Sequence, residues 1–225
     1  MCFSAAGSFT LSAVLAGVGA ASVAANSSRS VRLFAAVPLI FGAQQAAEGI
    51  VWLTIASPSD AMVNRVAVFA FLALALVVWP VWLPYSLRLA ETDDKRRRIL
   101  TAFLSLGVCV AATALVLLLR SIPVAVVAGR SIRYDRSGSS VALVDSLVLL
   151  AYVLPTIGPF FVSSMRLTRT IGTTLVLSLV ASAVIERDAT TSVWCFFAAI
   201  LSGLVFVAVT KSPVTTPLRP ADEPA

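Results

Sequence analysis

Histidine is absent from this 225-residue chain, and cysteine is scarce. Without histidine the chain can form no Ser-His-Asp triad, no HExxH zinc site and no histidine-ligated haem site. The three cysteines, Cys2, Cys109 and Cys195, form no CxxC pair, so we expect neither a disulfide framework nor a zinc ribbon. The sequence therefore predicts no metal site and no cofactor.

Charge is also scarce. Asp, Glu, Lys and Arg make up 12% of the residues, hydrophobic residues make up 59%, and the mean hydropathy is +0.95. A soluble domain carries about 25% charged residues, so this chain has too little polar surface to coat a globule in water. The net charge of +6 does not indicate nucleic-acid binding, because the basic residues form short clusters between apolar runs. We expect membrane lipids as partners, and the sequence does not indicate an oligomeric state.

Apolar runs dominate the chain, and each is near the length of about 20 residues that crosses a bilayer as a helix. They lie near residues 5–25, 31–56, 62–87, 99–119, 141–163, 169–186 and 191–210. This pattern predicts an all-α, polytopic transmembrane bundle of about seven helices over residues 1–210. Residues 211–225 contain four prolines and mixed charge, which predicts a disordered cytoplasmic tail.

The distribution of basic residues predicts the orientation of the bundle. With the N-terminus outside, the cytoplasmic side holds eleven of the 17 Lys and Arg residues. The cluster Lys95–Arg98 is the strongest single signal for the cytoplasmic side. We therefore expect the C-terminus in the cytoplasm and the protein in the cell membrane.

Small residues predict which helices pack closely. Ala13, Gly17 and Ala21 repeat at a spacing of four in the first span, and Gly42 and Ala46 do so in the second. Such spacing lets helix backbones approach within a membrane. We expect these two helices to be central and adjacent.

The second span carries Gln44, Gln45 and Glu48 on one helical face, and Trp52 continues that face by one turn. A carboxyl group in a bilayer is costly, and it normally faces the bundle interior or a wet cavity. Burial disfavours its charged form, so Glu48 is a candidate general acid or base, with Gln44 and Gln45 orienting it. The alternative is a purely structural hydrogen-bonded knot between helices.

Other polar residues are expected at a similar depth. Asp145 in the fifth span is a candidate counter-group for Glu48, with an interfacial role as the alternative. The segment between the fourth and fifth spans is long for a loop, and it carries Arg133 and Tyr134. We expect this loop to anchor the protein in the membrane interface, or to form a lid over an outer cavity.

Two more candidates come from the ends of the chain. Cys2 becomes the N-terminal residue if Met1 is removed, and Cys195 falls near the same face in the seventh span. Together they form a possible thiol site, although a free buried cysteine is usually a small hydrophobic residue. Trp52, Arg133, Tyr134 and Trp194 are the candidate substrate-binding residues.

Four segments carry a family resemblance. They are the MCFSA opening of Met1–Ala5, the run QQAAEGIVW of Gln44–Trp52, the pair Trp79-Pro80, and Ser192–Ala199. Together they resemble a family of small bacterial multi-pass membrane proteins that has no established biochemical role. Relatives often carry a histidine pair ahead of an Ile-x-Tyr, where this chain reads Arg130-Ser131-Ile132-Arg133-Tyr134. The resemblance implies that any metal or proton chemistry of those histidines is missing here or has been taken over by arginine.

Three functions fit these observations. The first is a membrane-embedded enzyme that isomerises or cyclises a lipophilic small molecule by acid/base chemistry in an outward-facing pocket at Glu48. The second is a small-solute or proton-coupled transporter with Glu48 as its ion site. The third is a non-catalytic structural or binding protein whose polar residues lock the bundle together.

Overall fold

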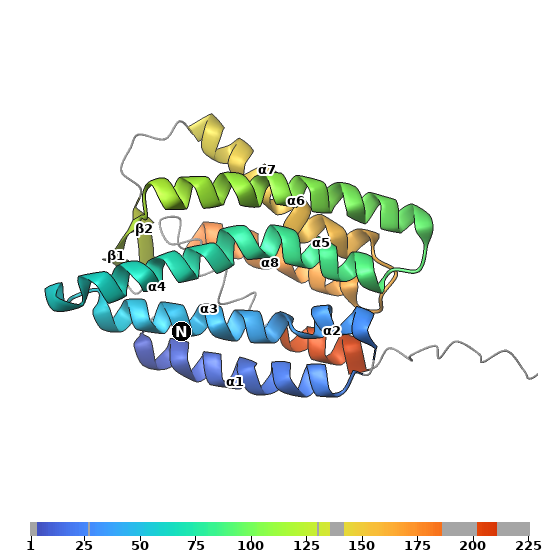
Figure 1. Ribbon diagram of the computed structural model, residues 1–225, viewed down its shortest axis with the longest axis horizontal. Helices are drawn as coiled ribbons and strands as arrows, with labels where there is room; N and C mark the ends of the chain where they lie inside the picture. The colour runs from blue at the N-terminus through green and yellow to red at the C-terminus, as the bar shows by residue number, and fades with distance from the viewer. Residues whose placement is uncertain (1–3, 27, 130, 136–141, 186–201, 211–225) are drawn as a thin grey trace, which may run out of the picture.

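The computed structural model describes residues 4–26, 28–129, 131–135, 142–185 and 202–210, and their helices form a bundle along one long axis (Figure 1). In chain order the α-helices are α1 (Ala5–Ala24), α2 (Arg29–Ala35), α3 (Val37–Thr54), α4 (Ala61–Ala73), α5 (Trp79–Ala90), α6 (Asp94–Arg120), α7 (Ala142–Val162) and α8 (Thr168–Ile185). A 3-10 turn η1 (Pro58–Asp60) precedes α4, a π-helical segment η2 (Leu74–Val78) joins α4 to α5, and residues 202–210 are helical. The predicted all-α bundle is confirmed.

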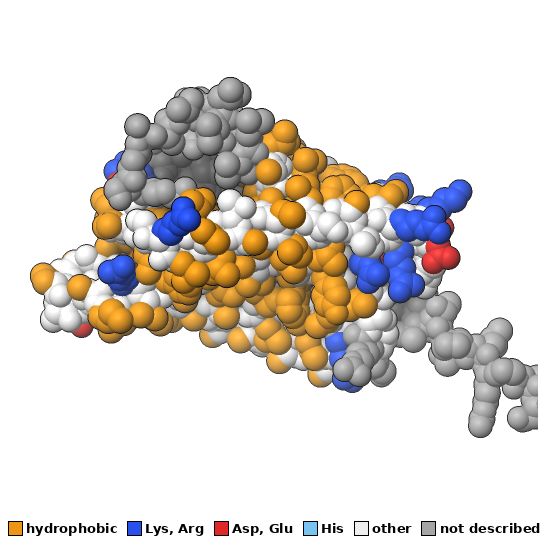
Figure 2. All heavy atoms as spheres, turned by 45° about the horizontal axis from the view of Figure 1, so that its top comes forward, with side chains coloured by type: hydrophobic (Ala, Val, Ile, Leu, Met, Phe, Trp, Pro, Cys, Tyr) orange, Lys and Arg blue, Asp and Glu red, His pale blue; other side chains and the backbone are white. Residues whose placement is uncertain are grey.

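Four helical stretches are long and apolar enough to cross a membrane: Ala5–Ala24, Ser30–Thr54, Pro58–Ala90 and Asp94–Arg120. They match the first four predicted spans to within a few residues. Figure 2 shows hydrophobic side chains spread over the middle of the molecule, with Lys and Arg side chains toward its ends. Large apolar side chains such as Leu149 and Leu150 of α7 are more than half exposed, as a lipid environment favours. The chain is therefore a membrane protein.

Two hydrophobic clusters fill the bundle. The first surrounds Phe34, Trp79 and Phe160 and includes Val205, Ala208 and Val209 from the helix at 202–210. The second surrounds Val51 and Phe71 and includes residues from α3, α4, α6 and the segment after α6. The face of α3 that carries Glu48 lies between them, because Phe41 belongs to the first cluster and Val51 to the second.

The first two spans are adjacent, as predicted, but they touch through other residues. Helices α1 and α3 run antiparallel, and a Cβ on Gly42 would lie 3.2 Å from the Ser12 carbonyl oxygen, while one on Gly19 would lie 2.6 Å from the Leu39 side chain. Gly17 instead has nothing within 4 Å of its Cβ position. The predicted Ala13-Gly17-Ala21 face is therefore wrong, because that face points away from α3. Of these two spans only the second is central. In its most apolar part, within Ser30–Thr54, 67% of the residues are buried, against 22% in the first span, Ala5–Ala24.

The long stretch from Pro58 to Ala90 is irregular because of its prolines. Pro80 and Pro84 lack the N–H that would bond the carbonyl groups four residues earlier, which loosens the helix around η2. Two neighbours cover the backbone there. The Tyr152 hydroxyl of α7 donates to the Ala75 carbonyl oxygen at 2.6 Å, and Gly107 of α6 lies directly against the Pro80 carbonyl oxygen.

The segment after α6 is a β-hairpin rather than a simple loop. Its predicted role, as an anchor in the membrane interface or as a lid, stays a prediction. Strand β1 (Val124–Ala128) pairs antiparallel with β2 (Ser131–Asp135), and Ala128 lies opposite Ser131. Gly129 has φ of 61°, the left-handed conformation that a two-residue hairpin turn requires. Ile132 is fully buried in the second cluster, so burial of one face ties the hairpin to the helices.

A buried glutamate joins the turn between α5 and α6 to the turn between α7 and α8. Glu91 accepts hydrogen bonds from the backbone N–H groups of Thr92 and Asp93 at 3.0 and 3.2 Å. It also accepts from the N–H and the hydroxyl of Ser164, both at 2.7 Å. Burial raises the pKa of Glu91, but these donors outweigh burial and hold the pKa below its ordinary value of 4.5.

Replacing Gly107 with Ala is expected to destabilise the bundle by about 2–3 kcal/mol or more, the cost of overpacking a tight contact. An added Cβ would lie 1.8 Å from the Pro80 carbonyl oxygen, so α5 and α6 would have to separate. Gly17→Ala is the matched control, and it should be neutral or stabilising by up to about 1 kcal/mol, since a helical glycine in open space gains from Ala. Thermal unfolding of the purified protein checks this, and equal effects of both changes would contradict the tight contact.

Low pH should weaken the hydrogen-bonded link that Glu91 forms between the two turns. Because the folded-state pKa lies below the unfolded value of 4.5, the carboxylate stabilises the fold above pH 4.5, and this contribution is lost as the pH falls through the folded pKa. Glu91→Gln should lower the melting temperature at neutral pH, because its amide NH2 would face either the N–H donor of Ser164 or those of Thr92 and Asp93. It should also flatten the decline of stability below pH 4.5. A pH series of melting temperatures for both proteins checks this, and parallel curves would refute it.

Candidate functional site

The polar face of α3 lies wholly inside the bundle. Gln44, Gln45 and Glu48 each have 0% of their surface exposed, so the structure brings together the three residues that the sequence placed on one face. A buried amide or carboxyl group is costly unless it is hydrogen-bonded, and all three have interaction partners. Glu48 is therefore a carboxyl group on a membrane helix, buried inside the bundle.

Trp79 fixes one of the two glutamines. Its indole N–H donates to Gln44 Oε1 at 2.8 Å, and its ring stacks on Phe41 with centroids 4.0 Å apart. Trp79 directly follows η2, so the irregular stretch of helix is tied to the polar face of α3. This contact was not predicted from the sequence. The available signal was that a buried indole needs an acceptor.

Helix α1 covers the other side of this polar face. Phe9 lies against Gly49, and the Ser12 hydroxyl donates to the Gly42 carbonyl oxygen at 2.8 Å. Ser8, one turn before Ser12 on the same face of α1, therefore lies level with the Gln45–Gly49 stretch of α3. It is fully buried, and its hydroxyl makes no hydrogen bond to any residue that the structure describes. The sequence interpretation passed over Ser8, although its spacing of four from Ser12 marks a common face.

The predicted substrate-binding residues separate into two groups. Trp52 and Tyr134 both pack against the second hydrophobic cluster, and the Tyr134 ring stacks on Phe71 with centroids 5.0 Å apart. Arg133 points away from this cluster and forms a two-pronged ion pair with Asp135, with Nε–Oδ1 at 2.6 Å and Nη2–Oδ2 at 2.9 Å. Its charge is therefore already balanced within the hairpin.

Four predicted residues are not placed. Asp145 belongs to the early part of α7, but its side chain is outside the described part of the structure, and so are Cys2, Trp194 and Cys195. A pairing of Glu48 with Asp145 and a thiol site of Cys2 with Cys195 stay predictions. The third cysteine, Cys109, is exposed on α6.

The described cluster suits proton transfer. A carboxyl group can give or take a proton, and an amide group can both donate and accept hydrogen bonds, so Gln45 and Gln44 are suited to either protonation state of Glu48. The surrounding apolar side chains exclude water and strengthen every electrostatic interaction in the cluster. A hard cation would find carboxylate and amide oxygens here, but Glu48 is the only anionic ligand among the three.

Comparisons with known proteins bear on the whole chain. No curated protein and no solved structure matches it. One family model, described as a family of unknown function (DUF6629), matches residues 1–219, which include the α3 cluster and all the described helices. The sequence resemblance predicted a family without an established role, and this part of the prediction is confirmed. The chain belongs to this family of unknown function.

Proposed function

We propose that this chain is a multi-pass enzyme of the cell membrane that uses Glu48 as a general acid and base on a lipophilic small molecule. The observation that carries the proposal is the complete burial of Glu48 beside two completely buried amides on α3. Ionisable residues inside a membrane are costly and are most often functional. In this proposal the N-terminus would lie outside and the C-terminus in the cytoplasm. The proposal also includes a bacterial origin of the family.

The charge distribution supports this orientation. The turn from α5 to α6 and the start of α6 carry Lys95–Arg98, and Arg166 and Arg169 lie at the same end of the bundle. Basic side chains gather at this end in Figure 2. Positive residues favour the cytoplasmic side, so in this orientation Thr54 and the hairpin would lie outside and Glu48 in the outer half.

A double-bond isomerisation needs little more than this cluster. Glu48 would donate its proton to one carbon of an alkene, which leaves a carbocation on the substrate. The resulting carboxylate would then take a proton from the neighbouring carbon on the other side, so the double bond shifts and Glu48 regains its proton. Trp52 and Tyr134 would offer aromatic faces to the cation, and Asp145 and Trp194 remain candidates for further contacts.

A proton-coupled or small-solute transporter is the second candidate. The irregular stretch at η2 supports it, because Trp79 links that stretch directly to Gln44. Interrupted helices beside a midplane ionisable group are common in transporters, and π-helical turns often mark functional sites. In a third, purely structural function, the same contacts would serve only to lock the bundle.

Glu48→Gln separates these functions, because it keeps the shape of the side chain and removes its titratable proton. The expected result is an unchanged melting temperature together with loss of the change in lipophilic metabolites that the wild-type protein causes when it is expressed. Mass spectrometry of lipid extracts measures that change. Glu91→Gln is the matched control, since it removes a second buried glutamate that already has four hydrogen-bond donors. It should cost stability and leave the metabolites of the folded fraction unchanged.

The outcomes differ for each function. If Glu48→Gln lowers the melting temperature and its folded fraction still causes the wild-type change in metabolites, the structural function stands and the enzyme fails. Purified protein in vesicles containing a pH-sensitive dye tests transport: proton flux in the wild-type protein that is lost in Glu48→Gln would replace the enzyme with the transporter.

The proposed orientation has its own test. Ser59, in the turn before α4, and Asp94, at the start of α6, are both exposed and lie at opposite ends of the bundle. A membrane-impermeant maleimide should label Ser59→Cys in intact cells above the wild-type level, and it should label Asp94→Cys only after the cells are permeabilised. The reverse pattern would invert the orientation and would place Glu48 in the inner half.

A further inference from the structure

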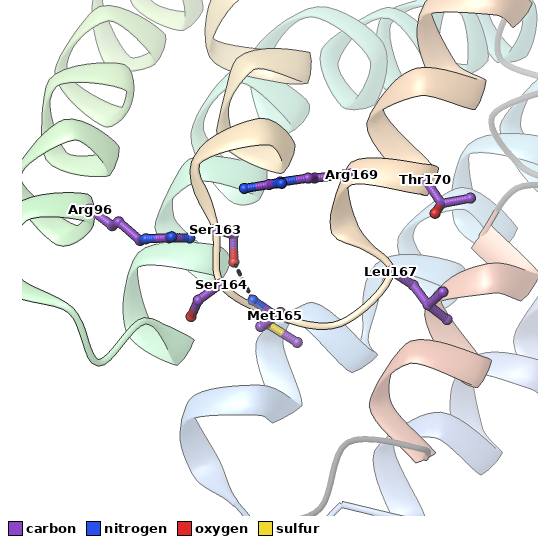
Figure 3. Close-up of a pocket in the computed structure, with 7 residues that line it drawn as sticks. All are labelled: Arg96, Ser163, Ser164, Met165, Leu167, Arg169 and Thr170. Atoms are coloured by element: carbon purple, nitrogen blue, oxygen red, sulfur yellow. Dashed lines mark hydrogen bonds between the residues drawn. The ribbon is translucent and has the colours of Figure 1, made fainter.

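A second site lies at the basic end of the bundle, away from Glu48. A hollow of about 310 Å³ opens between the start of α6 and the turn that joins α7 to α8. Arg96 of α6, Ser163 at the end of α7, and Arg169 and Thr170 of α8 line it (Figure 3). The described residues that line this hollow include two cations and no acid.

The two arginines have unused donors. Arg169 is exposed and forms no hydrogen bond or ion pair with any residue that the structure describes. The Arg96 guanidinium group donates a single bond, from Nη1 to the Val162 carbonyl oxygen at 3.1 Å, which holds it against the end of α7. In Figure 3 both side chains point toward Ser163, one from α6 and one from α8. Like charges that face one hollow repel each other unless an anion lies between them.

Neutral donors complete the site. The Ser163 side chain is buried, and its oxygen accepts from the Met165 N–H at 3.2 Å, so its hydroxyl hydrogen is available to a ligand. The backbone N–H groups of Arg169 and Thr170, in the first turn of α8, have no acceptor among the described residues. First-turn N–H groups of a helix and an arginine fork both match the oxygens of a phosphate group.

The nearby acids do not compete for these arginines. Glu91 lies on the other side of Ser164, where four hydrogen bonds already satisfy its carboxylate. Asp93 accepts from the backbone N–H of Arg96 at 2.9 Å, as the N-cap of α6. Both acids position the walls of the hollow and leave the two guanidinium groups to a ligand.

We propose that this hollow binds a phosphate group, carried by a lipid head group or by a soluble phosphate compound. The lipid source is favoured by position, because Phe161, two residues before Ser163 in the last turn of α7, is 44% exposed and offers an apolar surface to an acyl chain. Basic pockets between helices at the cytoplasmic face are suited to anionic head groups. This site is independent of the function proposed for Glu48.

Binding can be measured on the purified full chain in detergent by thermal unfolding. The probes are inorganic phosphate, short-chain phosphatidic acid and, as an uncharged comparison, short-chain phosphatidylcholine. Phosphatidic acid should raise the melting temperature saturably and more than phosphatidylcholine does. Arg169→Gln should weaken its apparent affinity by about tenfold or more, since one charge-assisted contact is lost. Arg166→Gln is the matched control, because Arg166 is exposed in the turn just before α8 and does not line the hollow.

Each outcome decides the proposal. A shift with phosphatidic acid alone identifies a lipid head group, and an equal shift with inorganic phosphate identifies a soluble phosphate compound; both support the site. No saturable shift with either probe, or equal weakening by Arg166→Gln and Arg169→Gln, would overturn it. If Arg169→Gln lowers the melting temperature without a ligand, Arg169→Lys decides, since it keeps the charge but loses the two-pronged contact. An affinity in Arg169→Lys between those of the wild-type protein and Arg169→Gln supports the site, and wild-type affinity in both variants would overturn it.

Discussion

Polar groups inside this bundle have to find their partners inside it, because the core of a bilayer offers no water to bond them. The stretch Pro58–Ala90 shows how strongly this constraint acts. Pro80 and Pro84 disturb the backbone bonding of the helix, and neighbouring helices cover the disturbed region. Tyr152 bonds the Ala75 carbonyl oxygen, and Gly107 allows α6 to lie against the Pro80 carbonyl oxygen. These contacts fix how α5, α6 and α7 meet.

The same constraint gives two buried glutamates different roles. Glu91 is surrounded by N–H and hydroxyl donors that favour its charged form, so it joins two turns and has no capacity left for another reaction. Glu48 lies among amides and apolar side chains, which suit either protonation state. This contrast is why the proposed chemistry is placed at Glu48, although both carboxyl groups are almost fully buried.

The two proposed sites lie at different ends of one rigid core. The first hydrophobic cluster runs from Trp79, which bonds Gln44, to Phe160, which packs against Phe34 near the turn that carries Ser163 and Ser164. A phosphate group at the basic end would therefore bind where α6, α7 and α8 meet. There it would join these three helices without touching the residues around Glu48.

The sequence alone determined the class of the protein and the most costly polar residue. Continuous apolar runs leave no soluble alternative, and a carboxylate in such a run is conspicuous, so the helices and the Gln44-Gln45-Glu48 face were predictable. The hairpin was not predictable as such, because its strands are short and are stabilised by burying Ile132 and Tyr134 against other helices. The wrong face of α1 was chosen because small residues occur all around that helix, and spacing cannot say which of them a neighbour touches. The bond from Trp79 to Gln44, the four donors on Glu91 and the arginine-lined hollow each join residues far apart in the chain. Only the packing of the helices brings them together.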